Sequence, residues 1–427
     1  MQYDISLSNI HALFDKRKLE EKHVVYSLHS ATLKNERLKA NLTLNEITEG
    51  ICSKSYLSKI ENNLLAPDKF VMKKLFERVN INYDRLLKIN KYGNLHEIVN
   101  FYLFNQKLKI KEVFDQLNKD YFITREALIK LIYYLSIDSL DDFSREVGFV
   151  DEVKGSLSDY ELMVLMFAII EFYIKTYQFQ NAKKYLLIID KVNIEDEGLR
   201  ILFEHQHFVV ACNLNNHADI FKYYNCLNNS NFYPMFRKYN NKLLYTYTEF
   251  DPNDSLKILE DMNMDIILET HLEDYYYAKC IVLSKLYRYE DMVKCILDNQ
   301  LNSPQFIALL GYGVSCLMKI ERNIDQIDHY KKTFLNYYQN DNFSKKDAIH
   351  KGFIKLMAME IENNNAYEII DYLKSYINIR NITHHHHLYT NYYRCKYYKL
   401  LGESSRYKEV YLFLFDEFNN THDLKFV

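Results

Sequence analysis

The feature that most constrains the fold is an amphipathic helical segment that recurs through the second half of the chain. Such segments begin at Phe179, His217, Asp254, Tyr289, Ile324, Tyr367 and Tyr407, at intervals of 35 to 43 residues. Longer apolar-rich segments alternate with them, so the repeating unit is a pair of helices. A single helical hairpin cannot bury its own apolar face, and neighbouring hairpins must stack to form a core. The sequence therefore predicts seven stacked hairpins.

The composition indicates helices throughout the chain. Only 9 glycines and 4 prolines occur in 427 residues, although 48% of the residues are hydrophobic. Sheet folds with many hairpin turns need more of these two residues. The repeat interval is close to the roughly 34 residues of tetratricopeptide repeats. The array resembles such repeats in its period more than in its residues, because Trp is absent.

Residues 31–88 show a different pattern, made of short helices with distinct start signals. Thr43 stands three residues before Glu46, a spacing at which each side chain can cap the other residue's backbone amide. Gly50 permits the left-handed backbone of a sharp turn, and Ser53 can cap the helix that follows it. The expected helices cover 31–40, 44–49, 53–61, 68–79 and 83–88.

The third of these helices is expected to present a polar face. Leu57 and Ile60 share its apolar side and should face inward. The outward residues are then Lys54, Ser55, Ser58 and Lys59. Residues 31–88 contain 11 Lys and Arg against 7 Asp and Glu, a local charge of +4 in a chain whose net charge is -3. Contact with nucleic acid is therefore expected from this segment and not from the chain as a whole.

These residues resemble the Cro/repressor-type (Xre) helix-turn-helix family. The resemblance rests on Leu42-Thr43, Glu46-Ile47, Gly50-Ile51, Ser53, residues 55–62 and Pro67, within about sixty residues. It implies that the helix from Ser53 enters the major groove while Thr43 touches the DNA backbone. The DNA-binding candidates are Thr43, Ser53, Lys54, Ser55, Ser58 and Lys59. The sequence departs from the family at Leu44, where members usually carry a Gln that contacts phosphate or supports the reading helix.

One such domain covers only about ten base pairs, so a homodimer on a palindromic double-stranded operator is expected. The alternative is a helix-turn-helix shape that packs a core without touching DNA, as in some enzymes. The local positive charge and the small polar residues on the outward face favour DNA binding.

A helix-turn-helix domain of this type, here called the reader, joined to a helical array resembles the peptide-pheromone-responsive quorum-sensing regulators of Gram-positive bacteria, often abbreviated RRNPP. The resemblance implies that a short signalling peptide binds the concave groove, clamped by side-chain amides, and changes how a dimer binds DNA. Polar or aromatic residues on the first helices of the pairs are candidates for this groove: Asn213, Asn241, Tyr245, Tyr276, Lys279, Tyr312, Lys355, Asn391 and Arg394. For each of them, a solvated or partly packed side chain is the alternative interpretation.

The expected fold is all-α: an N-terminal five-helix helix-turn-helix domain followed by a TPR-like right-handed superhelix. The expected organisation is a helical extension (1–30), the helix-turn-helix domain (31–92), a helical connector (93–150) and the sensor and dimerisation array (151–427). The extension is either an arm for DNA or dimer contacts or a packing helix. Within the connector about four helices are expected between Leu95 and Phe149, for example over 98–108 and 124–135, and a loop is expected over 151–158.

Enzymatic chemistry is not expected, and no cofactor is implied. The sequence contains no Gly-rich phosphate loop, no HExxH and no convincing Ser/His/Asp set. Within the run of four histidines only His384 and His387 could share a helix face, so no metal site is expected. The seven cysteines form no CxxC pair, which is typical of a reducing cytosol. No apolar run approaches the ~18 residues of a membrane span, and a cytoplasmic location is expected.

Two other functions remain open at this point. The array could be a scaffold that binds and modulates a signalling protein, in which case DNA would not affect that interaction. The chain could also be a mobile-element repressor of the same architecture, which differs in what it regulates and not in mechanism.

Overall fold

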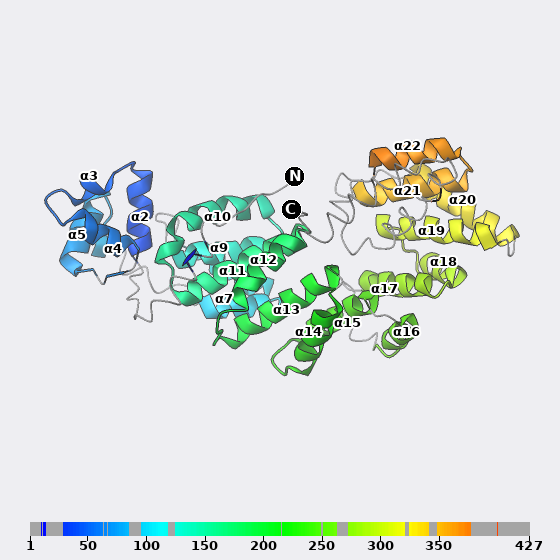
Figure 1. The fold of residues 1–427 in the computed structure, drawn as a ribbon, viewed down its shortest axis with the longest axis horizontal. Coiled ribbons are helices and arrows are strands. Elements are labelled where there is room, and N and C mark those ends of the chain that lie inside the picture. Colours follow the sequence, from blue (N-terminus) through cyan, green and yellow to red (C-terminus); the bar gives the residue numbers. More distant parts are fainter. Residues whose placement is uncertain are drawn as a thin grey trace, which may run out of the picture. The chain divides into compact units, whose positions relative to one another are not determined.

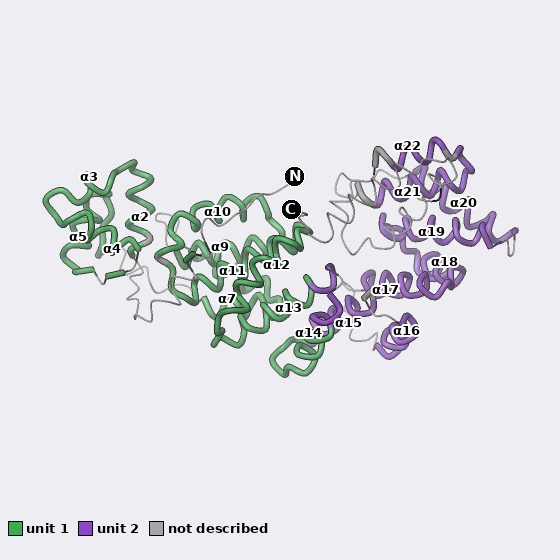
Figure 2. Tube along the Cα trace, in the orientation of Figure 1, with its two compact units in different colours: residues 1–210, 221–234 green, residues 211–220, 235–427 purple. Residues whose placement is uncertain are grey.

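In the computed structural model every element is a helix, and the residues described contain no strand. The structure describes residues 29–84, 95–117, 124–262, 272–320, 324–340 and 348–376, except 63, 66, 215 and 249–250, together with Ile10, Ala12, Leu13 and Lys399. The chain divides into two compact units, residues 1–210 with 221–234 and residues 211–220 with 235–427 (Figure 2). The predicted all-α class is confirmed for the described residues.

The N-terminal domain is built from four described helices that surround one small core (Figure 1). They are α2 (Ser30–Lys39), α3 (Leu44–Thr48), α4 (Lys54–Glu61) and α5 (Lys69–Arg78). Their starts agree with the sequence prediction to within one residue. Leu33, Leu57, Phe76 and the other central side chains are fully buried. The fifth helix, predicted over 83–88, lies mostly outside the described residues.

The segment after this domain consists of two helical hairpins. They are α7 (Leu95–Leu103) with α8 (Lys107–Asp115), and α9 (Thr124–Ser136) with α10 (Leu140–Val153). The helix predicted over 98–108 is wrong: α7 ends early because Asn105 takes a left-handed backbone, with a φ of 53°, and the amide of Gln106 bonds to the carbonyl of Phe101 at 2.8 Å. The helix predicted over 124–135 is confirmed.

The loop predicted over 151–158 is largely helical. Helix α10 runs to Val153 and continues into η1 (Lys154–Ser156). Lys154 stabilises this extension, since its ammonium lies 2.8 Å from the Asp151 carboxylate and 2.9 Å from the Asp151 carbonyl oxygen. Ser158 then caps the next helix together with Glu161.

The hairpins of the array follow in order along the rest of the chain. They pair α11 (Asp159–Lys175) with α12 (Phe179–Ile189), α13 (Glu197–Asn213) with α14 (His217–Asn229), α15 (Met235–Thr248) with α16 (Pro252–Glu260), α17 (Leu272–Lys285) with α18 (Tyr289–Asp298), α19 (Pro304–Ile320) with α20 (Ile324–Asn340), and α21 (Ala348–Ile361) with α22 (Ala366–Tyr376). All six described second helices begin within two residues of the predicted starts, and the predicted start at Tyr407 lies outside the described residues.

First helices of successive hairpins pack on one another within each unit. In the first unit α7, α9 and α11 pack in succession, and in the second unit α15, α17, α19 and α21 do the same. The two hairpins of the connector therefore stack in the manner of the array. The starts of α8, α10 and α12 at Lys107, Leu140 and Phe179 are 33 and 39 residues apart, close to the 35 to 42 residues between the later starts. None of the described helices has the length and apolar character needed to cross a membrane.

Candidate nucleic-acid interface

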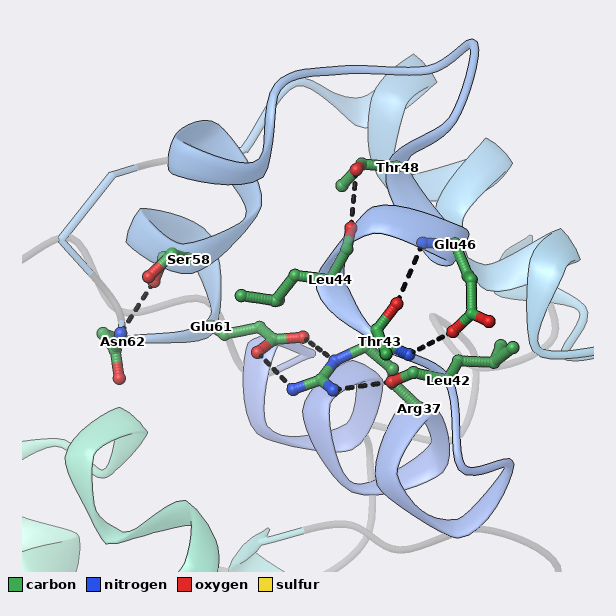
Figure 3. Close-up of polar contacts among 9 residues, drawn as sticks. All are labelled: Arg37, Leu42, Thr43, Leu44, Glu46, Thr48, Ser58, Glu61 and Asn62. Carbon is green, nitrogen blue, oxygen red and sulfur yellow. Dashed lines mark hydrogen bonds and ion pairs between the residues drawn. The ribbon is translucent and has the colours of Figure 1, made fainter.

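The start of α3, the second helix of the N-terminal domain, is fixed by a capping box between Thr43 and Glu46. The Thr43 hydroxyl accepts the amide of Glu46 at 3.3 Å, and the Glu46 carboxylate accepts the amide of Thr43 at 2.7 Å (Figure 3). The predicted capping box is confirmed. Hydrogen bonds from Thr43 to the Glu46 carboxylate, first from its backbone amide and then from its side chain, hold the pKa of the Glu46 carboxyl below its usual value.

The turn itself depends on a glycine with a left-handed backbone. Gly50 has a φ of 71°, as predicted, and a Cβ atom there would meet nothing within 4 Å. Glycine is therefore required for its backbone freedom and not for space. The amides of Ile51 and Cys52 both bond to the carbonyl of Thr48, at 2.9 and 3.1 Å. Ser53 then accepts the amide of Tyr56 at 3.2 Å and starts α4.

Helix α4 buries one side and exposes the other, close to the prediction. Leu57 and Ile60 have no exposed surface and belong to the domain core. The candidates Thr43, Ser53, Lys54, Ser55 and Lys59 are exposed, and Ser58 is half-buried. The first turn of α4 has no acidic residue. The exposed side thus offers hydroxyl and ammonium groups, which hydrogen-bond to base edges and phosphates.

A buried ion pair joins α4 to α2 on the side of α4 that faces the core. The Arg37 guanidinium of α2 binds both carboxylate oxygens of Glu61, at 2.7 and 2.9 Å, and donates to the Leu42 carbonyl at 2.8 Å (Figure 3). The Arg37 and Glu61 side chains are only 9% and 4% exposed. This pair was not predicted from the sequence. Its signal was a charged residue four positions after Leu33, on the apolar stripe of α2, where a buried charge requires a partner.

A second arginine closes α3. Arg78 at the end of α5 donates to the Glu49 carbonyl at 2.8 Å and reaches the Glu46 carbonyl at 3.5 Å. These carbonyls belong to the C-terminal end of α3, where backbone acceptors have no partner within the helix. Arg78 therefore holds the end of α3, whereas Arg37 joins α2 to the end of α4 and to the segment before α3.

Leu44 explains how the domain accommodates its departure from the family pattern. Its side chain is half-buried and packs against the core of the domain. Figure 3 shows it directed toward α4, while its carbonyl accepts the Thr48 hydroxyl at 2.6 Å. The position supports α4 by apolar packing and supplies no polar side chain.

The predicted peptide-groove residues that the structure describes all belong to the second unit, and they differ in exposure. Asn213 and Asn241 are buried, Tyr245, Tyr276, Lys279 and Tyr312 are half-buried, Lys355 is exposed, and Asn391 and Arg394 lie outside the described residues. Lys355 extends over the ring of Tyr372, 4.9 Å from its centre. Tyr312 contacts Tyr289 edge-on at 5.8 Å, and burial raises the pKa of its hydroxyl. Packing within the second unit accounts for Tyr312.

The described part of the chain contains no cluster of side chains suited to bind a metal ion. No group of three His, Cys, Asp or Glu side chains there could hold an ion. His384 and His387 lie outside the described residues.

The geometry of residues 30–78 is that of a helix-turn-helix domain. The helix-turn-helix family model matches residues 33–86, which confirms the predicted N-terminal domain. Among curated proteins there is no significant match. Among solved structures, the chain matches that of Bacillus thuringiensis PlcR in complex with the peptide PapR7 and DNA, with 14% identity over 73% of this chain and 95% of that one and a TM-score of 0.16. A TM-score this low does not establish a common fold.

Proposed function

We propose that this chain is a transcription regulator that reads double-stranded DNA with helix α4. The observation that carries the proposal is the exposed face formed by Ser53, Lys54, Ser55 and Lys59, on a helix whose other side is fixed by Leu57, Ile60 and the Arg37–Glu61 pair. A rigid helix with short polar side chains on one side fits the major groove, which admits one α-helix. Thr43, at the start of α3, would contact the DNA backbone.

The reader is expected to act as a homodimer. One domain contacts too few base pairs to define a site in a genome, whereas two copies related by a two-fold axis read a palindromic operator. Such a protein acts where the DNA is, in the bacterial cytoplasm, and needs no enzymatic activity.

The helical array is the proposed sensor. It would bind a short signalling peptide, with the polar and aromatic residues on the first helices as the contacts, and the bound peptide would favour one of two conformations of the dimer. The agreement between the predicted and observed hairpin starts supports an array of the expected kind. Asn213, Asn241, Tyr245, Tyr276, Lys279 and Lys355 remain candidates for peptide contacts.

The DNA-binding part is tested by selecting bound duplexes from a random pool with the full-length chain and measuring their affinity by fluorescence anisotropy. A motif with two-fold symmetry is expected. Lys54→Ala or Ser55→Ala should weaken binding to it by roughly 1–3 kcal/mol, which is about 5- to 150-fold. Lys351→Ala, an exposed lysine of α21, is the matched control and should change nothing. Absence of an enriched motif, or equal affinity for all variants, would refute sequence-specific DNA binding by α4.

The sensing part has its own experiment. A randomised pool of short peptides is passed over the immobilised full-length chain, and the retained peptides are added to the complex with the selected duplex. A change in DNA affinity supports peptide control. Retained peptides that leave DNA binding unchanged would instead favour the scaffold function, and a pool from which nothing is retained contradicts peptide sensing altogether.

A further inference from the structure

Two cysteines of the second unit lie at the same level of the hairpin formed by α17 and α18 (Figure 1). The hairpin turns at Tyr287, whose φ is 58°. Cys280 stands seven residues before Tyr287, and Cys295 stands eight residues after it. In two antiparallel helices such positions are level with each other, since one residue adds only about 1.5 Å along a helix axis. Both cysteines therefore lie about two helical turns away from the turn of the hairpin.

The two thiols pack against the same core and contact each other. Cys280 has no exposed surface and belongs to the apolar core that α17 to α22 form, and Cys295 is half-buried against that core. Both are free thiols, and the Cys280 thiol is hydrogen-bonded to the sulfur of Cys295. A disulfide needs two Cα atoms roughly 4.4–6.8 Å apart and side chains that point toward each other. Two thiols that share a hydrogen bond across a helical hairpin are close to this arrangement.

The two thiols also differ from each other in the way that stepwise oxidation requires. The hydrogen bond from Cys280 lowers the pKa of the Cys295 thiol more than burial raises it, and the Lys279 ammonium adds to the lowering. The same hydrogen bond, followed by burial, raises the pKa of the Cys280 thiol. Because the thiolate is the nucleophile, a partly exposed thiol of lowered pKa reacts before a buried one of raised pKa. Cys295 is therefore the thiol that would react first, and Cys280 stands beside it as the second.

We propose that Cys280 and Cys295 are a site of oxidative modification, at which a peroxide converts the two thiols into a reversible disulfide. The Cys295 thiolate attacks one oxygen of hydrogen peroxide, so that an S–O bond forms and the O–O bond breaks. Hydroxide leaves and takes up the proton that Cys295 had lost. The Cys280 sulfur then attacks the Cys295 sulfenic acid, the S–S bond forms, and the hydroxyl leaves with the Cys280 proton as water. Two thiols and one peroxide thus give one disulfide and two waters, and a thiol reductant reverses the reaction. The proposal does not depend on DNA or peptide binding.

Mass spectrometry of the full-length chain tests the bond directly. The reduced protein is treated with an equimolar amount of hydrogen peroxide, the remaining thiols are blocked with iodoacetamide, and tryptic peptides are analysed before and after reduction. Trypsin separates the two cysteines because it cuts after Lys285 and Lys294. The expected product joins the peptides of Cys280 and Cys295 and is two hydrogen atoms lighter than the two peptides together. Oxidation of the exposed Cys226 while the pair remains as free thiols would overturn the proposal.

Three serine variants assign the two roles. Cys295→Ser should abolish the disulfide and leave Cys280 as a free thiol. Cys280→Ser keeps the first thiol without its partner, so dimedone, which traps sulfenic acids, should label Cys295 severalfold more than in the unmodified protein. Cys316→Ser, at a buried cysteine of the same unit, is the matched control and should form the disulfide as the unmodified protein does.

The outcomes separate a specific pair from general oxidation. Equal loss of the disulfide in all three variants, or dimedone labelling of Cys280 in Cys295→Ser, would contradict a reaction that begins at Cys295 and ends at Cys280. The buried Cys280→Ser variant is not essential to the decision. If it does not fold, the disulfide of the unmodified protein and its loss in Cys295→Ser decide the question.

Discussion

At the scale of single residues, the side chains that shape the proposed DNA-reading face are mostly not on that face. Arg37, Glu61 and Arg78 are not among the residues expected to touch DNA, yet they fix where α3 ends and how α4 lies. A buried, bidentate arginine–carboxylate pair is directional, so it specifies one orientation of the two helices it joins. The exposed serines and lysines of α4 depend on it.

Removing one member of the buried pair should unfold the reader locally. Arg37→Ala leaves the Glu61 carboxylate buried and uncompensated, at an expected cost of about 3–5 kcal/mol. Hydrogen–deuterium exchange of peptides from residues 44–62 should show the loss of protection. Lys39→Ala breaks the exposed pair with Glu36, 2.8 Å long, and should change protection by no more than about 0.5 kcal/mol. Similar effects of the two variants would contradict this account of α4.

The capping box makes the start of α3 sensitive to acid. Because folding lowers the pKa of Glu46, the stabilisation by its carboxylate is complete above the carboxyl's usual pKa and is lost as the pH falls through the lowered value. Carboxyl NMR titration should find Glu46 below the usual range. Thr43→Ala removes the side-chain hydrogen bond to the Glu46 carboxylate and keeps the one from the backbone amide, so it should raise this pKa part of the way back. Asn45→Ala, exposed and next to Glu46, should leave it unchanged, and a normal pKa in the unmodified protein would refute the prediction.

Sequence reasoning found the local contacts of this domain and missed the distant ones. The capping box, the Gly50 turn and the Ser53 cap each join residues at most four apart, so spacing alone defines them. Arg37 and Glu61 are separated by 24 residues, and only the packing of α2 against α4 brings them together. For the same reason the half-burial of Ser58 was not predicted.

At the scale of helices, many helix ends have a residue other than glycine at the left-handed position that follows the helix. Eight non-glycine residues with a φ of 52–59° lie two positions after a helix end: Asn41, Asn80, Asn105, Asp138, Tyr177, Tyr287, Gln300 and Asn363. In each case the next amide bonds back to the carbonyl five residues earlier, as from Gln178 to Tyr173 at 2.8 Å. This is the Schellman arrangement, in which glycine is usual. It explains how so many turns form with only 9 glycines.

Hairpin starts in the array could be predicted from periodicity, whereas in the connector about four helices could be expected but not their pairing into stacked hairpins. The second helices of the array share a recurring amphipathic residue pattern. Helices α8 and α10 lack this pattern and share only the interval between helix starts. The helix predicted over 98–108 failed because the left-handed turn at Asn105 is made by a residue that helices also tolerate. Termination by asparagine or tyrosine is hard to detect in a sequence, since neither residue is as strong a breaker as glycine or proline.

The glycines that remain inside helices have separate roles, which alanine substitution should reveal. A Cβ atom on Gly311 of α19 would lie 2.5 Å from the Phe334 ring and 2.9 Å from Met357 Cβ, whereas one on Gly148 of α10 meets nothing within 4 Å. Gly311→Ala should therefore overpack α19 and destabilise the second unit by about 1–3 kcal/mol.

Gly148→Ala is the matched control for the same chemical change. It should stabilise the first unit by up to about 1 kcal/mol, since alanine is the better helix former. Urea unfolding followed by circular dichroism, combined with hydrogen exchange to assign each transition to a unit, measures both variants. A stabilising Gly311→Ala would mean that α19, α20 and α21 are not packed this closely.

At the scale of the whole molecule, the charge is unevenly distributed along the chain. Residues 31–88 carry +4, whereas the net charge of the full chain is -3, so the remaining residues carry -7. Phosphate attraction can therefore come from the reader alone, and the acidic remainder should reduce non-specific binding by the array. This distribution predicts an affinity for DNA whose salt dependence comes from the few cations of residues 31–88.

Those cations can be counted by salt titration of the complex with the selected duplex. Each phosphate contact contributes about 0.9 to the slope of log K against log salt. Lys59→Ala removes an exposed ammonium one turn along α4 from Ser55 and should flatten the slope by about 0.9 for each bound copy of the domain, with similar losses on all sequences. Lys351→Ala removes the same charge from the second unit and should leave the slope unchanged. A slope altered equally by both would place DNA contacts on the array and reject a reader confined to residues 31–88.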